Sequence, residues 1–167
     1  MSSTRTMGIS VTDVDTTAVL PLGFEYHEPA SSDDQGAKVW IYVFNDDGAS
    51  FIQGRIVMRD AGTATADGIL ATAGTLISTH RLLGVAQHTI AAASYGFILR
   101  RGIGEVMAGD GAVIGADTAL TSAGTTTAGT ALDFSAGTTA TDCVFAFSTE
   151  ASTGTNGLAT CMINCLG

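Results

Sequence analysis

Residues 94–120, SYGFILRRGIGEVMAGDGAVIGADTAL, decide the fold class of this chain. An apolar run leads into Arg100 and Arg101, Gly102 follows as a candidate bend, and a second apolar stretch begins after it. This order predicts a strand, a corner and a second strand. Helix signals are weak, because the chain holds 21 glycines and its alanine-rich pieces are too short to nucleate a helix alone.

The strongest strand signal is the run VWIYVF at residues 39–44. Successive side chains point to opposite faces of a strand, so the aliphatic residues of this run share one face and the aromatic residues share the other. Because both faces are apolar, we expect the strand to be covered on both sides. The turn sequence NDDG at 45–48, with Gly48 at positive φ, predicts that residues 50–60 return as its partner strand.

The rest of the chain alternates short apolar pieces with glycine turns. Residues 25–36 and 61–75 are expected to be loops, and at least two strands are expected within 80–109. Two more strands are predicted at 142–151 and 157–167. Regularly spaced short strands of this kind indicate an all-β barrel or sandwich.

The length of 167 residues suits one domain with a sizeable buried core. Residues 1–24 begin with a polar, Thr- and Ser-rich stretch, and they are predicted to form an extended N-terminal arm. Residues 25–167 are predicted to form a single barrel domain. The N-terminus lacks the apolar core of a signal peptide, and no apolar run reaches the roughly 18 residues of a membrane span, so maturation in a cytosol is expected.

Charge is sparse and unevenly distributed. Charged residues make up 14% of the chain, and 16 acids against 7 bases give a net charge of −9. No Lys or Arg follows Arg101. Direct nucleic-acid binding needs clustered cations, and binding to anionic membranes is disfavoured for the same reason, so neither partner is expected.

The three cysteines do not predict a disulfide framework, because their number is odd. On a strand, Cys161 and Cys165 share a face but stand about 13 Å apart at ~3.3 Å per residue, which is too far for a disulfide. No CxxC or nearby His supplies the spacing of a zinc site. We therefore expect buried free thiols and no metal.

Catalytic signals are equally sparse. A Ser–His–Asp triad can assemble from distant positions, so His27, His80 and His88 stay open as members, but no GxSxG elbow occurs. The run GIGEVMAG at 102–109 lacks the third glycine of a dinucleotide fingerprint, and the acids near NDDG lack EF-hand spacing. The prediction is no catalytic residue and no cofactor.

Seven residues are candidates for contact with a partner. Adjacent strand residues face opposite sides, so one of the two arginines can reach a partner's carboxylate; an exposed strand end is the alternative. Aromatic residues are enriched at protein interfaces, so those of the VWIYVF strand are candidates for contact, although such residues more often belong to the core. Apolar residues of the arm complete the candidate set, which is Ile9, Val11, Val14, Trp40, Tyr42, Arg100 and Arg101.

Residues 81–129 resemble the pattern of tailed-bacteriophage capsid decoration, or head cement, proteins. The matching pieces are Gly84–Val85–Ala86, Ser94–Tyr95–Gly96, Arg101–Gly102 with Glu105–Val106, and Gly115 to Leu120. Residues 38–57 resemble the same family's upstream strand and the segment after it. One departure is GADTAL, where the family often has GDAL, which moves the acid to Asp117.

The resemblance implies a small antiparallel β-barrel of the β-tulip or β-clip type. It also implies a homotrimer at local three-fold axes, made in the host cytoplasm, that binds the major capsid protein on the outer capsid surface and holds its subunits together. The arm can add a strand to a capsid sheet. Deleting residues 1–20 is then expected to weaken capsid binding and to leave the barrel folded.

Two other classes of function remain open. One is a different virion role, such as a head fibre, a tail component or a host-binding surface protein. The other is an enzyme or a sugar-binding module on a β-barrel, because a fold alone does not fix a function. A cleft in which His80 or His88 meets a carboxylate and a Ser would favour the enzyme.

Overall fold

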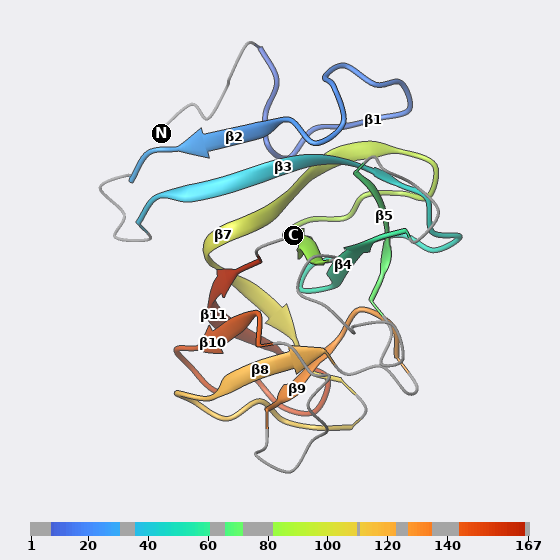
Figure 1. The fold of residues 1–167 in the computed structure, drawn as a ribbon. Helices are drawn as coiled ribbons and strands as arrows, with labels where there is room; N and C mark the ends of the chain where they lie inside the picture. The colour runs from blue at the N-terminus through green and yellow to red at the C-terminus, as the bar shows by residue number, and fades with distance from the viewer. Residues whose placement is uncertain are drawn as a thin grey trace.

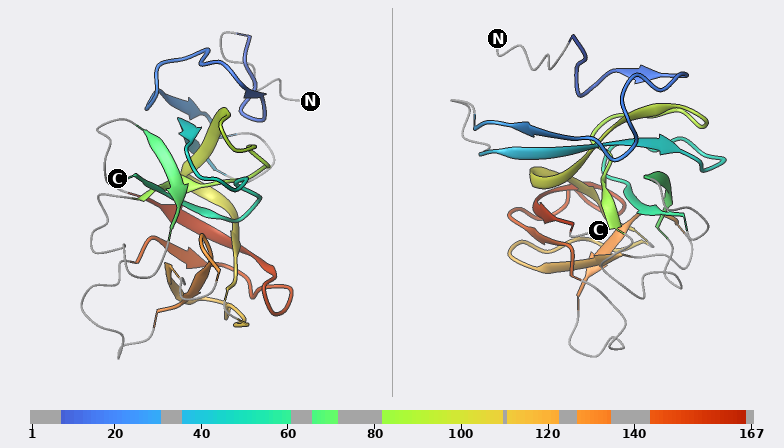
Figure 2. Two further views of the ribbon diagram at one scale, coloured as in Figure 1. Left: turned by 90° about the vertical axis from the view of Figure 1, so that its right-hand side faces the viewer. Right: turned by 45° about the horizontal axis from the view of Figure 1, so that its top comes forward.

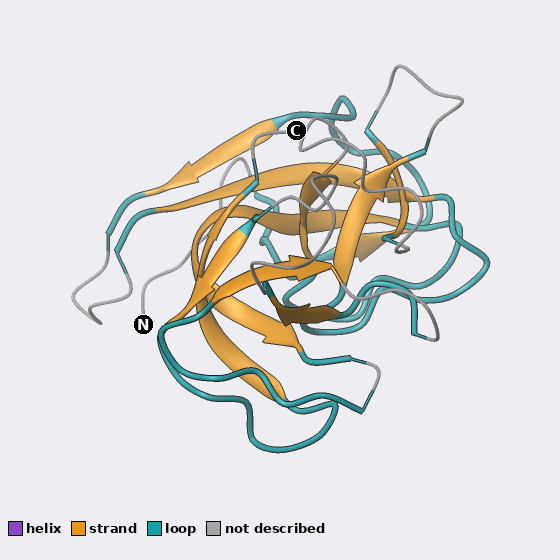
Figure 3. Ribbon diagram, turned by 60° about the horizontal axis from the view of Figure 1, so that its bottom comes forward, coloured by secondary structure: helices purple, strands orange, loops and turns teal. Residues whose placement is uncertain are grey.

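The computed structural model is built from β-strands (Figure 1; Figure 3). It describes residues 8–30, 36–60, 66–71, 82–109, 111–122, 127–134 and 144–165. Within these ranges no helix is long and apolar enough to cross a membrane. The strands are β1 (Val14–Asp15), β2 (Glu25–Glu28), β3 (Lys38–Asn45), β4 (Ile56–Arg59), β5 (Asp67–Leu70), β6 (Leu82–Val85), β7 (Tyr95–Met107), β8 (Ala119–Ser122), β9 (Ala131–Asp133), β10 (Ala146–Ser148) and β11 (Leu158–Asn164).

Five strands close into a barrel in the order β3–β5–β4–β6–β7, with β7 pairing back to β3. The predicted all-β barrel is thereby confirmed. Every pair among the described strands is antiparallel except β3–β5, which is parallel. A closed ring of five strands cannot alternate in direction throughout, so one neighbouring pair has to be parallel.

The predicted hairpin of residues 39–44 and 50–60 is wrong, since β4 pairs with β5 and β6. Asn45 explains the difference. Its side-chain amide donates to the carbonyls of Ala49, Ile90 and Ala91 at 3.0–3.1 Å, so the turn is tied to a distant loop. Phe51 then bridges to Ile90, which directs the chain away from β3. Gly48 is not among the positive-φ residues.

β7 belongs to two parts of one continuous sheet. Its first half lies in the barrel wall, and residues 101–107 pair with β11, which continues through β10 and β8 to β9 (Figure 1). We call β7–β11–β10–β8–β9 the lower sheet. Residues 95–107 form one continuous strand where two strands and a corner were predicted, and the bend is reduced to Gly102 at φ +120°.

The predicted covering of both faces of β3 is confirmed by two apolar clusters. Ile41 and Val43 belong to the cluster inside the barrel, to which all five barrel strands contribute. Trp40 and Tyr42 belong to a larger cluster outside the barrel wall, where the lower sheet and the N-terminal segment cover the barrel. The candidate contact residues of β3 are therefore core residues of this chain.

Residues 8–24 lie against the barrel (Figure 2). Val11 is buried in the outer cluster, and β1 pairs with the start of β7. The amide of Gly23 donates to the Tyr42 carbonyl at 2.8 Å, and the amide of Val19 donates to the Tyr42 hydroxyl at 3.3 Å. The expectation that the barrel folds unchanged without residues 1–20 does not fit this packing.

Two predicted loops contain strands. β2 lies within the polar segment 25–36, and β5 lies within the small-residue segment 61–75. β2 pairs with β3 through four residues, and its Glu28 accepts the indole N–H of Trp40 at 2.8 Å. These two segments form strands because they pair with neighbouring strands, although their residue types alone do not indicate a strand.

Candidate functional site

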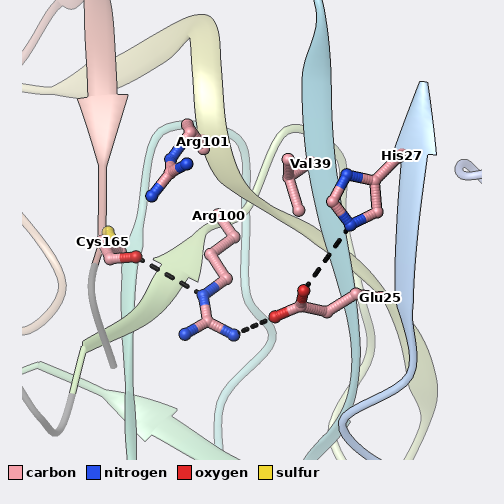
Figure 4. A pocket seen from close by; sticks show the side chains of 6 residues that line it. All are labelled: Glu25, His27, Val39, Arg100, Arg101 and Cys165. Carbon is pink, nitrogen blue, oxygen red and sulfur yellow. Dashed lines mark hydrogen bonds and ion pairs between the residues drawn. The ribbon is translucent and has the colours of Figure 1, made fainter. Parts of the chain in front are cut away.

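A polar pocket of about 170 Å³ opens where β2, β3, β7 and the end of β11 meet (Figure 4). It brings the two predicted arginines together with groups from distant parts of the sequence. Its lining residues are Glu25, His27, Val39, Arg100, Arg101 and Cys165.

Arg100 is the centre of the pocket. Its guanidinium forms an ion pair with Glu25 of β2, and its Nε donates to the Cys165 carbonyl at 3.4 Å. The Cys165 amide in turn donates to the Arg100 carbonyl at 3.0 Å. The carboxylate that sequence reasoning assigned to a partner is therefore, in this structure, one of the chain's own.

Arg101 leaves β7 in another direction (Figure 4). It is exposed, and its Nε donates to the side-chain oxygen of Asn164 on β11 at 3.1 Å. The two adjacent arginines thus have different environments, as expected for neighbouring residues of a strand. Of the two arginines, Arg101 is the one whose charged group is exposed to solvent.

The pocket is suited to ionic contact and unsuited to nucleophilic catalysis. The Cys165 thiol is buried, and burial raises its pKa to about 12, so it stays protonated at neutral pH. His27 is 72% exposed and lies 3.7 Å from Glu25. Histidine and carboxylate are adjacent here, but the nearby thiol is not an activated nucleophile.

The other five predicted contact residues are separated from the pocket. Val11, Trp40 and Tyr42 are buried in the outer cluster, because β3 and the N-terminal segment pack against each other there. Ile9 is partly buried against the same cluster. Val14 is 38% exposed and is the most exposed of the five; its contact with a partner stays a prediction.

The remaining candidates for chemistry do not form a second site within the described residues. Both ring nitrogens of His88 are buried without a hydrogen-bond partner, and burial lowers the pKa of its side chain, so the ring is neutral. Both Asp47 oxygens accept backbone amides, from Ala49 and Leu70. His80 and Cys143 lie outside the described residues.

Metal-binding geometry is likewise missing from the described part of the chain, where no group of three or more His, Cys, Asp or Glu side chains is arranged so that it could hold a metal ion. Cys161 and Cys165 are free and buried, as predicted. Sequence reasoning missed Glu25, and it missed the pocket positions of His27 and Cys165. The alternation of EYHE at 25–28 has the period of a strand and could have indicated β2.

Comparison with known proteins gives a likeness of fold to a solved structure. No protein-family model and no curated protein matches the chain. Among solved structures, the head fiber gp8.5 N base of bacteriophage phi29 is similar, with a TM-score of 0.52 and 18% sequence identity. The match covers 75% of this chain and 94% of that chain. At this identity the likeness shows a shared all-β fold.

Proposed function

We propose that this chain is a structural protein of a bacteriophage virion that attaches to the outer surface of the capsid. The observation that carries the proposal is the fold shared with the head fiber base over 94% of that structure. The resemblance of residues 38–129 to capsid decoration proteins points, independently of that fold, to the same location.

The chemistry of the described residues supports a structural role. The polar pocket uses its charges for internal pairing between β2 and β7, and its thiol is protonated. A closed barrel with two apolar clusters supplies the stiffness that an attachment protein needs. Enzyme and sugar-binding roles are disfavoured on these grounds.

Two attachment roles are compatible with the fold. As a cement protein, the chain bridges neighbouring major capsid subunits, as the sequence resemblance implies. As the base of a head fibre, it anchors a projecting structure, and the fold likeness to a fiber base favours this role. A homotrimer at local three-fold axes stays a prediction of the sequence resemblance.

The test is whether the purified protein binds to expanded, empty heads of the phage that encodes it. Purified protein is mixed with heads, unbound protein is removed by sedimentation, and the heads are imaged by electron microscopy. Added density at regular positions on the outer surface is expected. Heads that sediment without the protein would overturn the proposal.

The same sample separates the two roles. A cement protein raises the temperature at which heads release their subunits, because it holds neighbouring subunits together, and it covers the shell at repeated positions. A fibre base leaves that temperature unchanged, since it bridges no subunits. Differential scanning calorimetry of heads with and without the protein makes the distinction.

A further inference from the structure

The outer face of the lower sheet carries an unusual set of apolar side chains in one line. The strands β7, β11, β10 and β8 each contribute one residue, and the last member directly follows β9. The first four residues are successive cross-strand partners, and the amide of the last donates to the carbonyl of the fourth. We call this line the apolar row. Its members, in order across the sheet, are Ile103, Met162, Phe147, Ala119 and Phe134.

The apolar row is exposed. Phe147 is 57% exposed, Met162 is 47% exposed and Phe134 is 37% exposed. The residues next to Phe147 and Met162 along their strands, Ala146 and Ile163, are buried in the outer cluster, so the row lies on the face of the sheet away from that core. Large apolar side chains placed side by side on a surface mark a contact site.

Opposite charges flank the row. Arg101, Ile103 and Glu105 are alternate residues of β7, so the arginine stands on one side of the row and the glutamate on the other. Arg101 donates to Asn164, and Glu105 accepts the Thr160 hydroxyl at 3.2 Å, both on neighbouring β11. At its β7 end the apolar row therefore has a basic residue on one side and an acidic residue on the other.

We infer that the occupant of this face is a second copy of the chain. When two copies pack face to face about a two-fold axis that runs along the row, Phe147 and Met162 meet their counterparts. The same rotation exchanges the two flanks, so Arg101 of each copy comes over Glu105 of the other. The surface is complementary to itself in both apolarity and charge, which is the requirement of an isologous interface.

The size of the face sets the strength of the contact. Five strands at ~4.8 Å and five residues at ~3.3 Å span roughly 24 Å by 17 Å, or about 400 Å² a copy. The total of about 800 Å² is below the roughly 1,200 Å² of stable interfaces, so the dimer is weak, with a dissociation constant in the micromolar range or above. This contact is independent of attachment to a capsid.

The first experiment measures mass against concentration. Sedimentation velocity of the full chain, from micromolar to millimolar concentration, is expected to show monomer converting to dimer. The double variant Phe147→Ser/Met162→Ser weakens the dimer at least about tenfold, because it removes two large apolar side chains from the contact. The matched control is Val113→Ser, at a 51% exposed valine outside the row, which leaves dimerisation unchanged.

The second experiment tests the geometry through charge. Arg101→Glu makes both flanks acidic and Glu105→Arg makes both flanks basic, so each variant alone dimerises several-fold more weakly. Mixed together, the two variants form a heterodimer in which every flank faces its opposite. The double variant Arg101→Glu/Glu105→Arg recovers the dimer of the unaltered chain. Circular dichroism confirms that each variant is folded.

Three results would overturn the inference. The first is a monomer at every concentration, and the second is a dimer that the Phe147→Ser/Met162→Ser change leaves intact. The third is a mass of three chains, which is the trimer that the sequence resemblance implies. A dimer without head binding supports this inference while rejecting the proposed function, so the two can fail separately.

Discussion

At Gly84 the barrel wall has no room for a side chain. A Cβ there would lie 2.5 Å from the carbonyl oxygen of Leu99 on the neighbouring strand β7. The obstacle is backbone, which cannot rotate away as the tip of a side chain can. The glycine of the GVA sequence is thus required by the close approach of β6 to β7.

Gly84→Ala is therefore expected to lower the free energy of unfolding by about 1–3 kcal/mol, the usual cost of overpacking a filled interior. Urea denaturation followed by circular dichroism measures the change. Gly48→Ala is the matched control, because its Cβ meets nothing within 4 Å and its backbone is outside the left-handed region. Equal stability of the two variants would contradict the argument.

Among the elements, β2 depends on two glutamates for its place on the barrel. Glu25 pairs with Arg100 of β7, and Glu28 accepts the indole N–H of Trp40 in β3. The two contacts differ in energy, because the ion pair is partly exposed while Trp40 is buried, with 6% of the residue exposed. Exposed ion pairs contribute little, whereas a buried donor left without an acceptor is costly.

Glu28→Ala is expected to destabilise the chain by about 1–3 kcal/mol, because the buried indole N–H loses its acceptor. Trp40 is the single tryptophan of the chain, so its fluorescence reports directly on this contact. Both the emission maximum and the urea midpoint should change. Glu150→Ala, which removes an exposed carboxylate, is the control and should change neither.

For the molecule as a whole, buried thiols link folding to pH. Burial raises the pKa of Cys161 and Cys165 from 9.0 to about 12. Below pH 9 both the folded and the unfolded chain keep these protons. Between pH 9 and pH 12 the unfolded chain loses them first, so deprotonation favours the unfolded state.

The free energy of unfolding should accordingly fall as pH rises from 9 towards 12. Urea titrations at a series of pH values measure the slope. In the Cys161→Ala/Cys165→Ala variant the slope is smaller, whatever the loss of overall stability from the cavities. A slope that does not depend on these thiols would rule out their part in the effect.

Sequence reasoning succeeded where the signal was local. The VWIYVF strand, the buried thiols and the all-β class follow from the alternation and type of neighbouring residues. It failed for β2 and β5, whose polar or small residues form strands through pairing with distant partners. It also failed for the pocket, because the contact of Arg100 with Glu25 joins residues 75 positions apart.

The continuity of β7 has a mechanical consequence. A single covalent backbone runs from the barrel wall into the lower sheet, with no intervening loop to serve as a hinge. A pull or shear applied to one sheet is transmitted to the other along peptide bonds and strand hydrogen bonds. We therefore expect the barrel and the lower sheet to move together under load.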